Sequence, residues 1–219
     1  MLTTSKRRIE TPDLPEAAYL NPDDPPSKRK ILQTALRLFA LYGLDAVTVR
    51  QIADEAGYTN PALFKFFPTK DALALYLFEC CYLELFEALK VAVGDSTTFD
   101  EGLEAILRVF FSQLERNLDA FLFVQDHLRQ MWPKVPVHTR KKSILGLIHQ
   151  VLRRGMDEGV VRGANPDLLV AAITGTLQQF ARLLYFGEFK GKPSDWRQEL
   201  NIIIKRIVAP QRVRSRRSS

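Results

Sequence analysis

A short segment at residues 60–67 carries side chains whose types and spacing suit contact with another molecule. Leu63 and Phe67, at i and i+4, share one side of a helix and can anchor it to a core. The residues on the opposite side are small or basic: Pro61, Ala62 and Lys65. Such a face has no packing purpose within the chain, whereas a B-DNA major groove about 12 Å wide admits a helix whose first residues reach base edges. The segment therefore favours nucleic-acid contact.

The stretch just before this segment supplies the other half of a helix-turn-helix. Thr48 and Gln51 have the spacing of a capping box, which predicts the start of a helix. Gly57 tolerates the positive φ that a tight turn requires, and Ala53 provides a small side chain where the two helices cross. Asn60 is the expected cap of the second helix.

From Ser27 onward the chain has the pattern of an all-α protein. Apolar residues recur at helical spacing between caps and glycines, and no strand-like alternation occurs. Ser27 is the expected N-cap of the first helix, Thr69 of the long fourth helix and Ser194 of the last. The predicted helices span 28–42, 49–56, 61–67, 70–93, 99–116, 118–131, 138–158, 166–186 and 195–208. The predicted fold class is all-α, with nine or so helices and no sheet.

The composition excludes several classes of protein. The chain has 219 residues, 46% of them hydrophobic and 26% charged, which is a globular rather than a disordered or collagen-like composition. Its two cysteines, Cys80 and Cys81, are adjacent, so neither a disulfide scaffold nor a cysteine-based zinc site is expected. No segment resembles a secretion leader or has the roughly 18 uninterrupted apolar residues of a membrane span. We therefore expect a cytoplasmic protein without membrane contact.

Charge is distributed unevenly along the chain. Residues 27–70 contain more basic than acidic side chains, whereas 71–125 are strongly acidic, which favours a polyanionic partner for the first part. Lys28, Arg29 and Lys30 fall in the first turn of the first helix, where the helix dipole disfavours each cation by about 0.3–1 kcal/mol. A nearby DNA phosphate would offset this cost; solvation after a polar arm is the other explanation.

The titratable residues do not assemble into an enzyme or metal site. His127, His138 and His149 recur every eleven residues. The last two are three helical turns apart, about 16 Å, and cannot hold one ion. No paired carboxylates, no nucleophile with a base and no phosphate-binding loop are recognisable, so we predict no catalytic residue, no metal and no cofactor. His149 borders an apolar stripe, where it is either a core residue or a polar group of a pocket.

Two runs, Phe39–Gly43 and Val47–Leu73, resemble the DNA-binding domain of TetR-family transcriptional regulators. The agreement covers about residues 28–76 and includes an aromatic pair in the second motif helix and a lysine-acidic-x-leucine start of the long helix. The resemblance implies a helix-turn-helix head that reads DNA and a larger helical domain that binds an effector and forms dimers. The implied domains are an arm at 1–26, the DNA-binding domain at 27–73, the effector-binding and dimerisation domain at 74–210 and a basic tail at 211–219.

The resemblance also implies which side chains contact DNA. Arg50 matches a residue that touches a base, with pairing to Asp54 at i+4 as its structural alternative, and Lys70 matches a phosphate contact. The full predicted set is Lys28, Thr48, Arg50, Thr59, Asn60, Pro61, Ala62, Phe64, Lys65, Phe66 and Lys70. Phe64 and Phe66 stand where the family commonly has tyrosine or histidine, so hydrogen bonds to phosphate are lost at both positions.

Two further sites follow from the resemblance. An effector cavity in the larger domain would have mostly apolar walls, so a hydrophobic or amphipathic ligand is expected. Its candidate residues, which equally suit a plain core, are Phe110, Phe111, Phe121, Phe123, His127, Met131, Trp132, His149 and Leu152. The last two helices match the family's dimer-forming pair, and their apolar stripe is too wide for one buried face. The candidate dimer residues are Leu169, Ile173, Leu177, Phe180, Leu184, Trp196, Leu200, Ile203 and Ile207.

These observations predict a homodimeric, ligand-responsive transcriptional regulator, most simply a repressor that a small effector releases from a pseudo-palindromic DNA operator. Two other classes are open: an all-helical enzyme and a helical adaptor that binds only proteins. Neither would bind DNA with a sequence preference and a steep loss of affinity in salt, so a gel-shift experiment separates them from a regulator.

Overall fold

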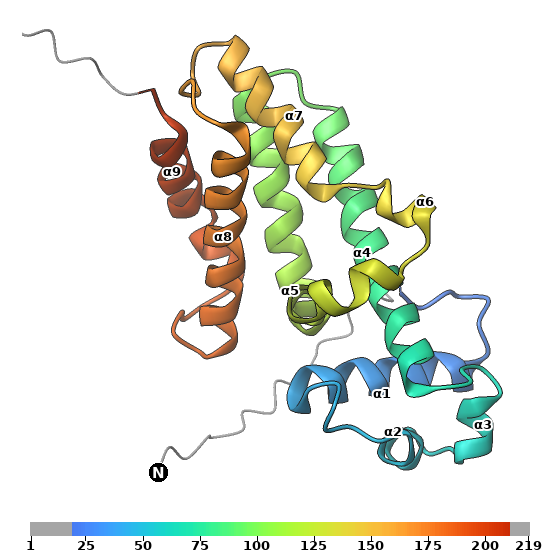
Figure 1. Cartoon of the computed structure of the whole chain (residues 1–219). Helices are drawn as coiled ribbons and strands as arrows, with labels where there is room; N and C mark the ends of the chain where they lie inside the picture. Colours follow the sequence, from blue (N-terminus) through green and yellow to red (C-terminus); the bar gives the residue numbers. More distant parts are fainter. Residues whose placement is uncertain (1–18, 211–219) are drawn as a thin grey trace, which may run out of the picture.

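The computed structural model describes residues 19–210, and all regular elements within this range are helical (Figure 1). The elements are α1 (Pro26–Tyr42), α2 (Val49–Ala56), α3 (Asn60–Phe64), α4 (Lys70–Gly94), α5 (Phe99–Met131), α6 (Val137–Arg140), α7 (Ile144–Asp157), α8 (Pro166–Tyr185) and α9 (Arg197–Val208). Short 3₁₀ helices, η1 (Trp132–Lys134) and η2 (Pro193–Trp196), precede α6 and α9. The all-α prediction is confirmed for this range. Most of the predicted arm, and the predicted basic tail, lie outside it.

The predicted start and end of α2 are confirmed. The Thr48 side chain accepts a hydrogen bond from the Gln51 backbone N–H at 3.2 Å, and the Gln51 side-chain oxygen accepts one from the Thr48 N–H at 2.8 Å. Gly57 ends α2 with φ 78° and ψ 29°, a left-handed conformation that glycine adopts without strain. The first motif helix is therefore defined by bonds between neighbouring residues.

The second motif helix, α3, is shorter than predicted. Thr59 rather than Asn60 is its N-cap residue, and the helix ends at Phe64. The backbone N–H of Phe67 still donates to the Leu63 carbonyl at 3.0 Å, so the chain continues in a turn after the last helical residue. The anchor at Phe67 thus belongs to this turn and not to the helix itself.

The starts of α1 and α9 also differ from the prediction. α1 begins at Pro26, before the expected cap Ser27, because proline fits the first turn of a helix, where its missing N–H loses no bond. At the other end of the chain, a 3₁₀ turn occupies the residues around Ser194, so α9 starts only at Arg197.

α5 contains the break that the sequence predicts after residue 116. Asn117 leaves the helical conformation, with φ −159° and ψ 77°, and α5 bends there. The Asn117 side-chain oxygen accepts the Ala120 backbone N–H at 2.9 Å and so caps the second half of the helix. By contrast, the predicted helix at 138–158 is divided into α6 and α7, and Ser143 caps α7.

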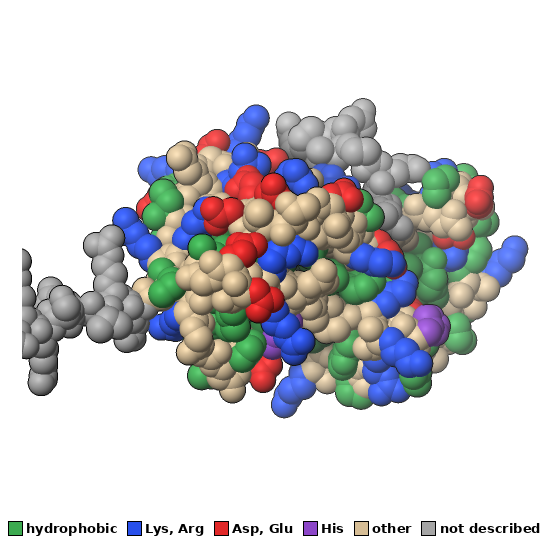
Figure 2. All heavy atoms as spheres, turned by 90° about the horizontal axis from the view of Figure 1, so that it is seen from above, with side chains coloured by type: hydrophobic (Ala, Val, Ile, Leu, Met, Phe, Trp, Pro, Cys, Tyr) green, Lys and Arg blue, Asp and Glu red, His purple; other side chains and the backbone are tan. Residues whose placement is uncertain are grey.

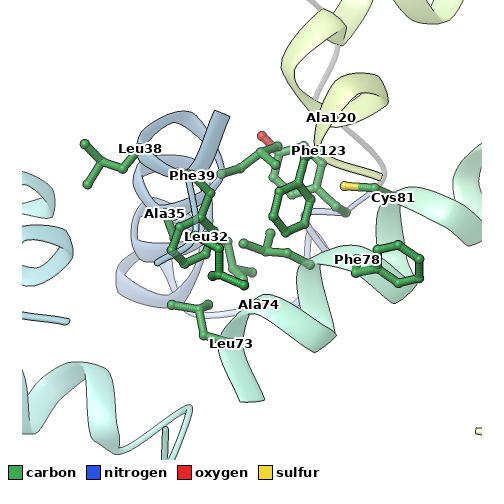
Figure 3. Close-up of a cluster of buried hydrophobic side chains, with 14 of the residues drawn as sticks. Leu32, Ala35, Leu38, Phe39, Leu73, Ala74, Phe78, Cys81, Ala120 and Phe123 are labelled. Carbon is green, nitrogen blue, oxygen red and sulfur yellow. The ribbon is translucent and has the colours of Figure 1, made fainter. Parts of the chain in front are cut away.

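The buried side chains form two clusters. The head cluster joins α1, α2, α3 and the first half of α4 to residues from the second half of α5. The body cluster joins the second half of α4 and most of α5 to α7, α8 and α9. Figure 3 shows the head cluster where α1, α4 and α5 meet. The rings of Phe39 on α1 and Phe123 on α5 stack there, with centroids 5.8 Å apart. α4 and α5 therefore pass through both clusters and link them.

The face remote from α2 and α3, seen from above in Figure 2, has basic, acidic and apolar side chains interspersed. This face therefore has no extended region of positive charge, which is what attracts a polyanion. Within residues 19–210, none of the helices combines the length and the hydropathy that crossing a membrane requires.

Gly155 of α7 marks a close contact in the body cluster. A β-carbon at this position would meet Val161 and would lie 2.7 Å from Phe99 Cδ2. We expect Gly155→Ala to lower stability by about 1–3 kcal/mol, because the added methyl overpacks a filled core. Gly94→Ala at the end of α4, where a β-carbon meets no atom within 4 Å, is the control and should keep or slightly raise the melting temperature. Thermal unfolding followed by circular dichroism measures both; equal melting temperatures would contradict this packing.

Candidate nucleic-acid interface

α3 lies with α2 at one end of the molecule, away from α8 and α9 (Figure 1). Leu63 and Phe67 are buried in the head cluster, as their spacing predicts. The opposite side is uncovered by the described part of the chain: Phe64 keeps 46% of its surface exposed, and Pro61 and Lys65 are exposed as well. The short segment is thus held by two anchors and presents its other side to solvent.

Arg50, in the first turn of α2, makes the contact with Asp54 that its structural alternative predicts; its base contact stays a prediction. Its side chain is 82% exposed, and its Nε lies 3.6 Å from Asp54 Oδ2. Exposed ion pairs at i, i+4 contribute little to stability, so the guanidinium can exchange Asp54 for another partner. Of the other residues predicted to touch DNA, Thr48 and Thr59 are exposed and Asn60, Ala62 and Phe66 are half-buried.

Lys28, predicted to contact a phosphate, has partners within the chain. Its ammonium lies 2.9 Å from Asp24 Oδ1 and 4.8 Å from the centroid of the Tyr76 ring, and its side chain is only 18% exposed. Burial lowers the pKa of Lys28, but the hydrogen bond to Asp24 and the contacts with Tyr76 outweigh burial, so the pKa is raised. Lys28 therefore ties the segment before α1 to α4. This contact explains a cation in the first turn without a phosphate, and a DNA contact of Lys28 stays a prediction.

Lys70 is also bonded within the chain. At the start of α4, its ammonium donates hydrogen bonds to the backbone carbonyls of Leu44, at 2.8 Å, and Val47, at 2.9 Å. A phosphate contact implies an ammonium directed outward and free to bind. The half-buried Lys70 instead holds the loop between α1 and α2.

The predicted effector residues do not form one group. Those in the body cluster are Phe110, Phe111, Phe121 and Leu152. Those in the head cluster, or packed against it, are Phe123, Met131 and Trp132. The division falls after the bend at Asn117: Phe121 belongs to the body cluster, whereas Phe123, two residues later, packs in the head cluster against α1. Sequence reasoning also missed Phe180 as a member of the first set: its ring lies 5.6 Å from that of Phe111.

The two histidines of the predicted pocket lie in different places. The His127 ring is 4.9 Å from that of Phe123, and burial lowers the pKa of His127, although nearby carboxylates oppose the shift. His149 Nε2 lies 2.9 Å from Asp167 Oδ1 at the start of α8, beside a groove of about 680 Å³ with polar and charged walls. His149 is therefore not a core residue but lines this groove as a polar group. Over residues 19–210, no three His, Cys, Asp or Glu side chains are grouped to hold a metal ion.

Most of the predicted dimer residues face the chain's own core rather than its outside. Leu169, Ile173, Leu177, Phe180 and Leu200 are buried in the body cluster. Leu184, Trp196 and Ile207 are half-buried and pack against it. Ile203 alone of the set is exposed. The physical reason is that the wide apolar stripes of α8 and α9 cover two sides of each helix, and the prediction selected the inner one.

The outward sides of α8 and α9 carry residues that the prediction omitted. Leu168 on α8 and Ile202 on α9 are exposed, as Ile203 is. Gly175 leaves open space beside α8, since a β-carbon there would meet no atom within 4 Å. Leu168, Ala171 and Gly175 follow each other at helical spacing, and this row of apolar and small residues is the signal that the sequence contained.

The sequence is similar to known transcriptional regulators, and the matching family model covers the helix-turn-helix. Residues 31–77 match the family described as Bacterial regulatory proteins, tetR family. The HTH-type transcriptional repressor KstR2 of Mycolicibacterium smegmatis is 29% identical over 151 residues, which cover 67% of this chain and 72% of that protein. The HTH-type transcriptional regulator BetI of Brucella anthropi is 32% identical over 110 residues, which cover 49% of this chain and 57% of that protein.

Solved structures share the whole architecture. The ketosteroid transcriptional regulator KstR2 of Mycobacterium tuberculosis superposes with a TM-score of 0.75 at 22% identity, covering 89% of this chain and 100% of that one. The fatty acid degradation regulator FadR of Bacillus halodurans gives 0.69 at 19% identity, with 88% and 99% covered. FadR of Bacillus subtilis, solved in complex with stearoyl-CoA, gives 0.65 at 20% identity, with 81% and 97% covered. At these identities the likeness is one of fold.

Proposed function

The chain belongs to the TetR family of transcriptional regulators, and on that premise we propose that it is a homodimeric repressor which a small effector releases from a pseudo-palindromic DNA operator. The named relatives regulate transcription and are not enzymes. A repressor works where the DNA is, so we place this one in the cytoplasm. The observation that carries the proposal is the uncovered side of α3.

The uncovered side of α3 suits a major groove. It is held from behind by Leu63 and Phe67 and directs small side chains and Lys65 outward, so base edges can approach its backbone. Phe64 and Phe66 have no hydroxyl for a phosphate and instead offer apolar contact to sugars and base methyl groups. The proposed contact residues are Thr48, Arg50, Thr59, Asn60, Pro61, Ala62, Phe64, Lys65 and Phe66.

The proposed dimer forms through the outward sides of α8 and α9. Gly175 has no β-carbon, so a helix of a second copy can approach closely there. Leu168, Ile202 and Ile203 supply exposed apolar surface around that approach. Two heads related by a two-fold axis would then enter successive major grooves, about 34–36 Å apart, on a pseudo-palindromic site.

The proposed effector is hydrophobic or amphipathic. Support comes from the phenylalanine-rich body cluster and from relatives, since one solved FadR structure holds stearoyl-CoA and one KstR2 is described as a ketosteroid regulator. Because α4 and α5 pass through both clusters, a ligand bound between them in the body would also displace the head. The effector must bind the DNA-free arrangement more tightly than the DNA-bound one, since equal affinity shifts no equilibrium.

Selection of duplexes from a random DNA pool tests the proposed function. The purified protein should enrich a two-fold symmetric sequence, and gel shifts with this duplex should weaken steeply as salt rises, because each neutralised phosphate releases counterions. A scrambled duplex of equal length is the control. Failure to enrich any sequence would overturn the proposal in favour of a protein-binding adaptor.

Arg50→Ala tests the assignment of a base contact. We expect the free energy of binding to the selected duplex to weaken by about 1–3 kcal/mol, with a smaller effect on the scrambled duplex, because a base contact acts only on the right sequence. Arg153→Ala on α7 is the matched control: its side chain is also exposed, but it lies outside the helix-turn-helix and should leave both affinities unchanged. Equal losses on the two duplexes would assign Arg50 to the DNA backbone instead.

A further inference from the structure

Lys70 links the end of the helix-turn-helix back to its beginning by hydrogen bonds, and we call this closed arrangement a ring. Its ammonium donates to the carbonyls of Leu44, at 2.8 Å, and Val47, at 2.9 Å. Both of these residues lie in the loop between α1 and α2, and their side chains are buried in the head cluster. Since α2, α3 and the turns around them all lie between Val47 and Lys70, one side chain joins the two ends of the whole motif.

The two hydrogen bonds stabilise the Leu44 and Val47 carbonyls and the Lys70 ammonium, each of which would be unfavourable without a partner. Backbone carbonyls close to a core require hydrogen-bond partners, and a charged donor makes a stronger bond than a neutral one. Lys70 itself stands at the positive N-terminal end of α4, where the helix dipole disfavours a cation, and the two carbonyl dipoles offset this. Because Thr48, the N-cap residue of α2, directly follows Val47, the bond to Val47 also fixes the position at which α2 begins.

From this ring we infer that Lys70 is a positioning residue for base reading; the inference rests on the proposed function. α3 is joined to α4 by the chain itself, and α2 is joined to α4 through Lys70. A displacement of α4 therefore moves both motif helices together and keeps the spacing between Arg50 and the outward side of α3. Without the lysine, the start of α2 can shift while the anchors of α3 stay in place. The head would then lose sequence preference and keep its general attraction to DNA.

Acetylation of the unmodified protein tests the contact directly. Acetic anhydride is applied to the free protein and to the protein bound to its selected duplex, and mass spectrometry reports the modification of each lysine. Exposed Lys65 on α3 is the internal comparison. We expect Lys65 to react in the free protein and to be protected by the duplex, and Lys70 to be protected equally in both. If Lys70 reacts when free and is protected only by DNA, it is a phosphate contact and the inference fails.

Lys70→Met tests the consequence, because methionine keeps much of the stem and removes the donors. Affinity for the selected and the scrambled duplex is measured over a range of salt concentrations. We expect binding to the selected duplex to fall about 5- to 150-fold, the range for one lost base contact. The scrambled duplex should bind as before, with the same salt slope. Equal losses on both duplexes, with a slope smaller by about one, would indicate a phosphate contact and overturn the inference.

Two controls separate this inference from other causes of failure. Lys65→Met is the matched variant, and we expect it to weaken both duplexes alike. Circular dichroism shows whether Lys70→Met is folded. If the variant is unfolded, acetylation of the unmodified protein decides between the intrachain contact and a phosphate contact of Lys70. If the unmodified protein selects no duplex, the proposed function fails, whereas protection or reaction of Lys70 in the free protein still tests the ring contact by itself.

Discussion

Ile204→Asp is expected to unfold the protein, whereas Ile203→Asp leaves each protomer folded. Ile204 is 0% exposed and lies in the body cluster, while its neighbour Ile203 on α9 is 40% exposed. Aspartate at 204 loses the packing of a large side chain, about 2–5 kcal/mol. It also leaves a carboxylate buried without a partner, which costs about 3–5 kcal/mol in comparable cases. The two losses together are similar to the roughly 5–15 kcal/mol that stabilises a whole domain.

The outcome is measured by thermal unfolding and by size-exclusion chromatography with light scattering. We expect Ile203→Asp to elute as a folded monomer, because the charge lies in the proposed dimer face, and to melt below the unmodified protein only by what the dimer contributes. A monomer reads half of a palindrome, so its binding to the selected duplex should fall by about 10²–10⁴-fold, the usual gain from linking two binding modules. A dimer that survives Ile203→Asp would contradict the proposed interface. A folded Ile204→Asp would contradict the described core.

Phe123→Ala is expected to lower the free energy of unfolding by about 3–5 kcal/mol. The Phe123 side chain is buried and stacks on Phe39, and this contact joins the second half of α5 to α1 (Figure 3). Its removal leaves a cavity between the two helices that the surrounding side chains fill only in part. DNA binding should also weaken, because α1 is part of the head and loses its support from α5.

Phe64→Ala is the matched variant and should behave in the opposite way. Phe64 is exposed on α3, so its loss should change the free energy of unfolding by no more than about 0.5 kcal/mol. Its ring belongs to the proposed DNA contact, so binding to the selected duplex should weaken. Urea unfolding and gel shifts measure both properties in both variants. Similar losses of stability for the two would contradict a core role for Phe123 and a surface role for Phe64.

Much of the fold and of the uncovered side of α3 could be predicted because the causes lie within a few residues of each other. The cap at Thr48, the left-handed end at Gly57 and the break at Asn117 each depend on bonds inside one turn. The anchors Leu63 and Phe67 follow from i, i+4 spacing. Even these local patterns leave one or two residues undecided at a helix end, as α3 shows with Thr59 instead of Asn60 as its N-cap.

Contacts between distant parts of the chain could not be predicted in this way. Lys28 and Lys70 both stand at helix starts, where a nearby phosphate is a reasonable guess, but Tyr76 of α4 lies against Lys28 and the loop after α1 accepts the bonds of Lys70. The apolar stripes of α8 and α9 were visible, yet spacing along a helix does not tell which side meets a core. Packing of α9 against α5 and α8 determines that Ile204 is enclosed and Ile203 left outside. Helix ends depend on hydrogen bonds within a turn, whereas partners and faces depend on how the folded chain brings remote segments together.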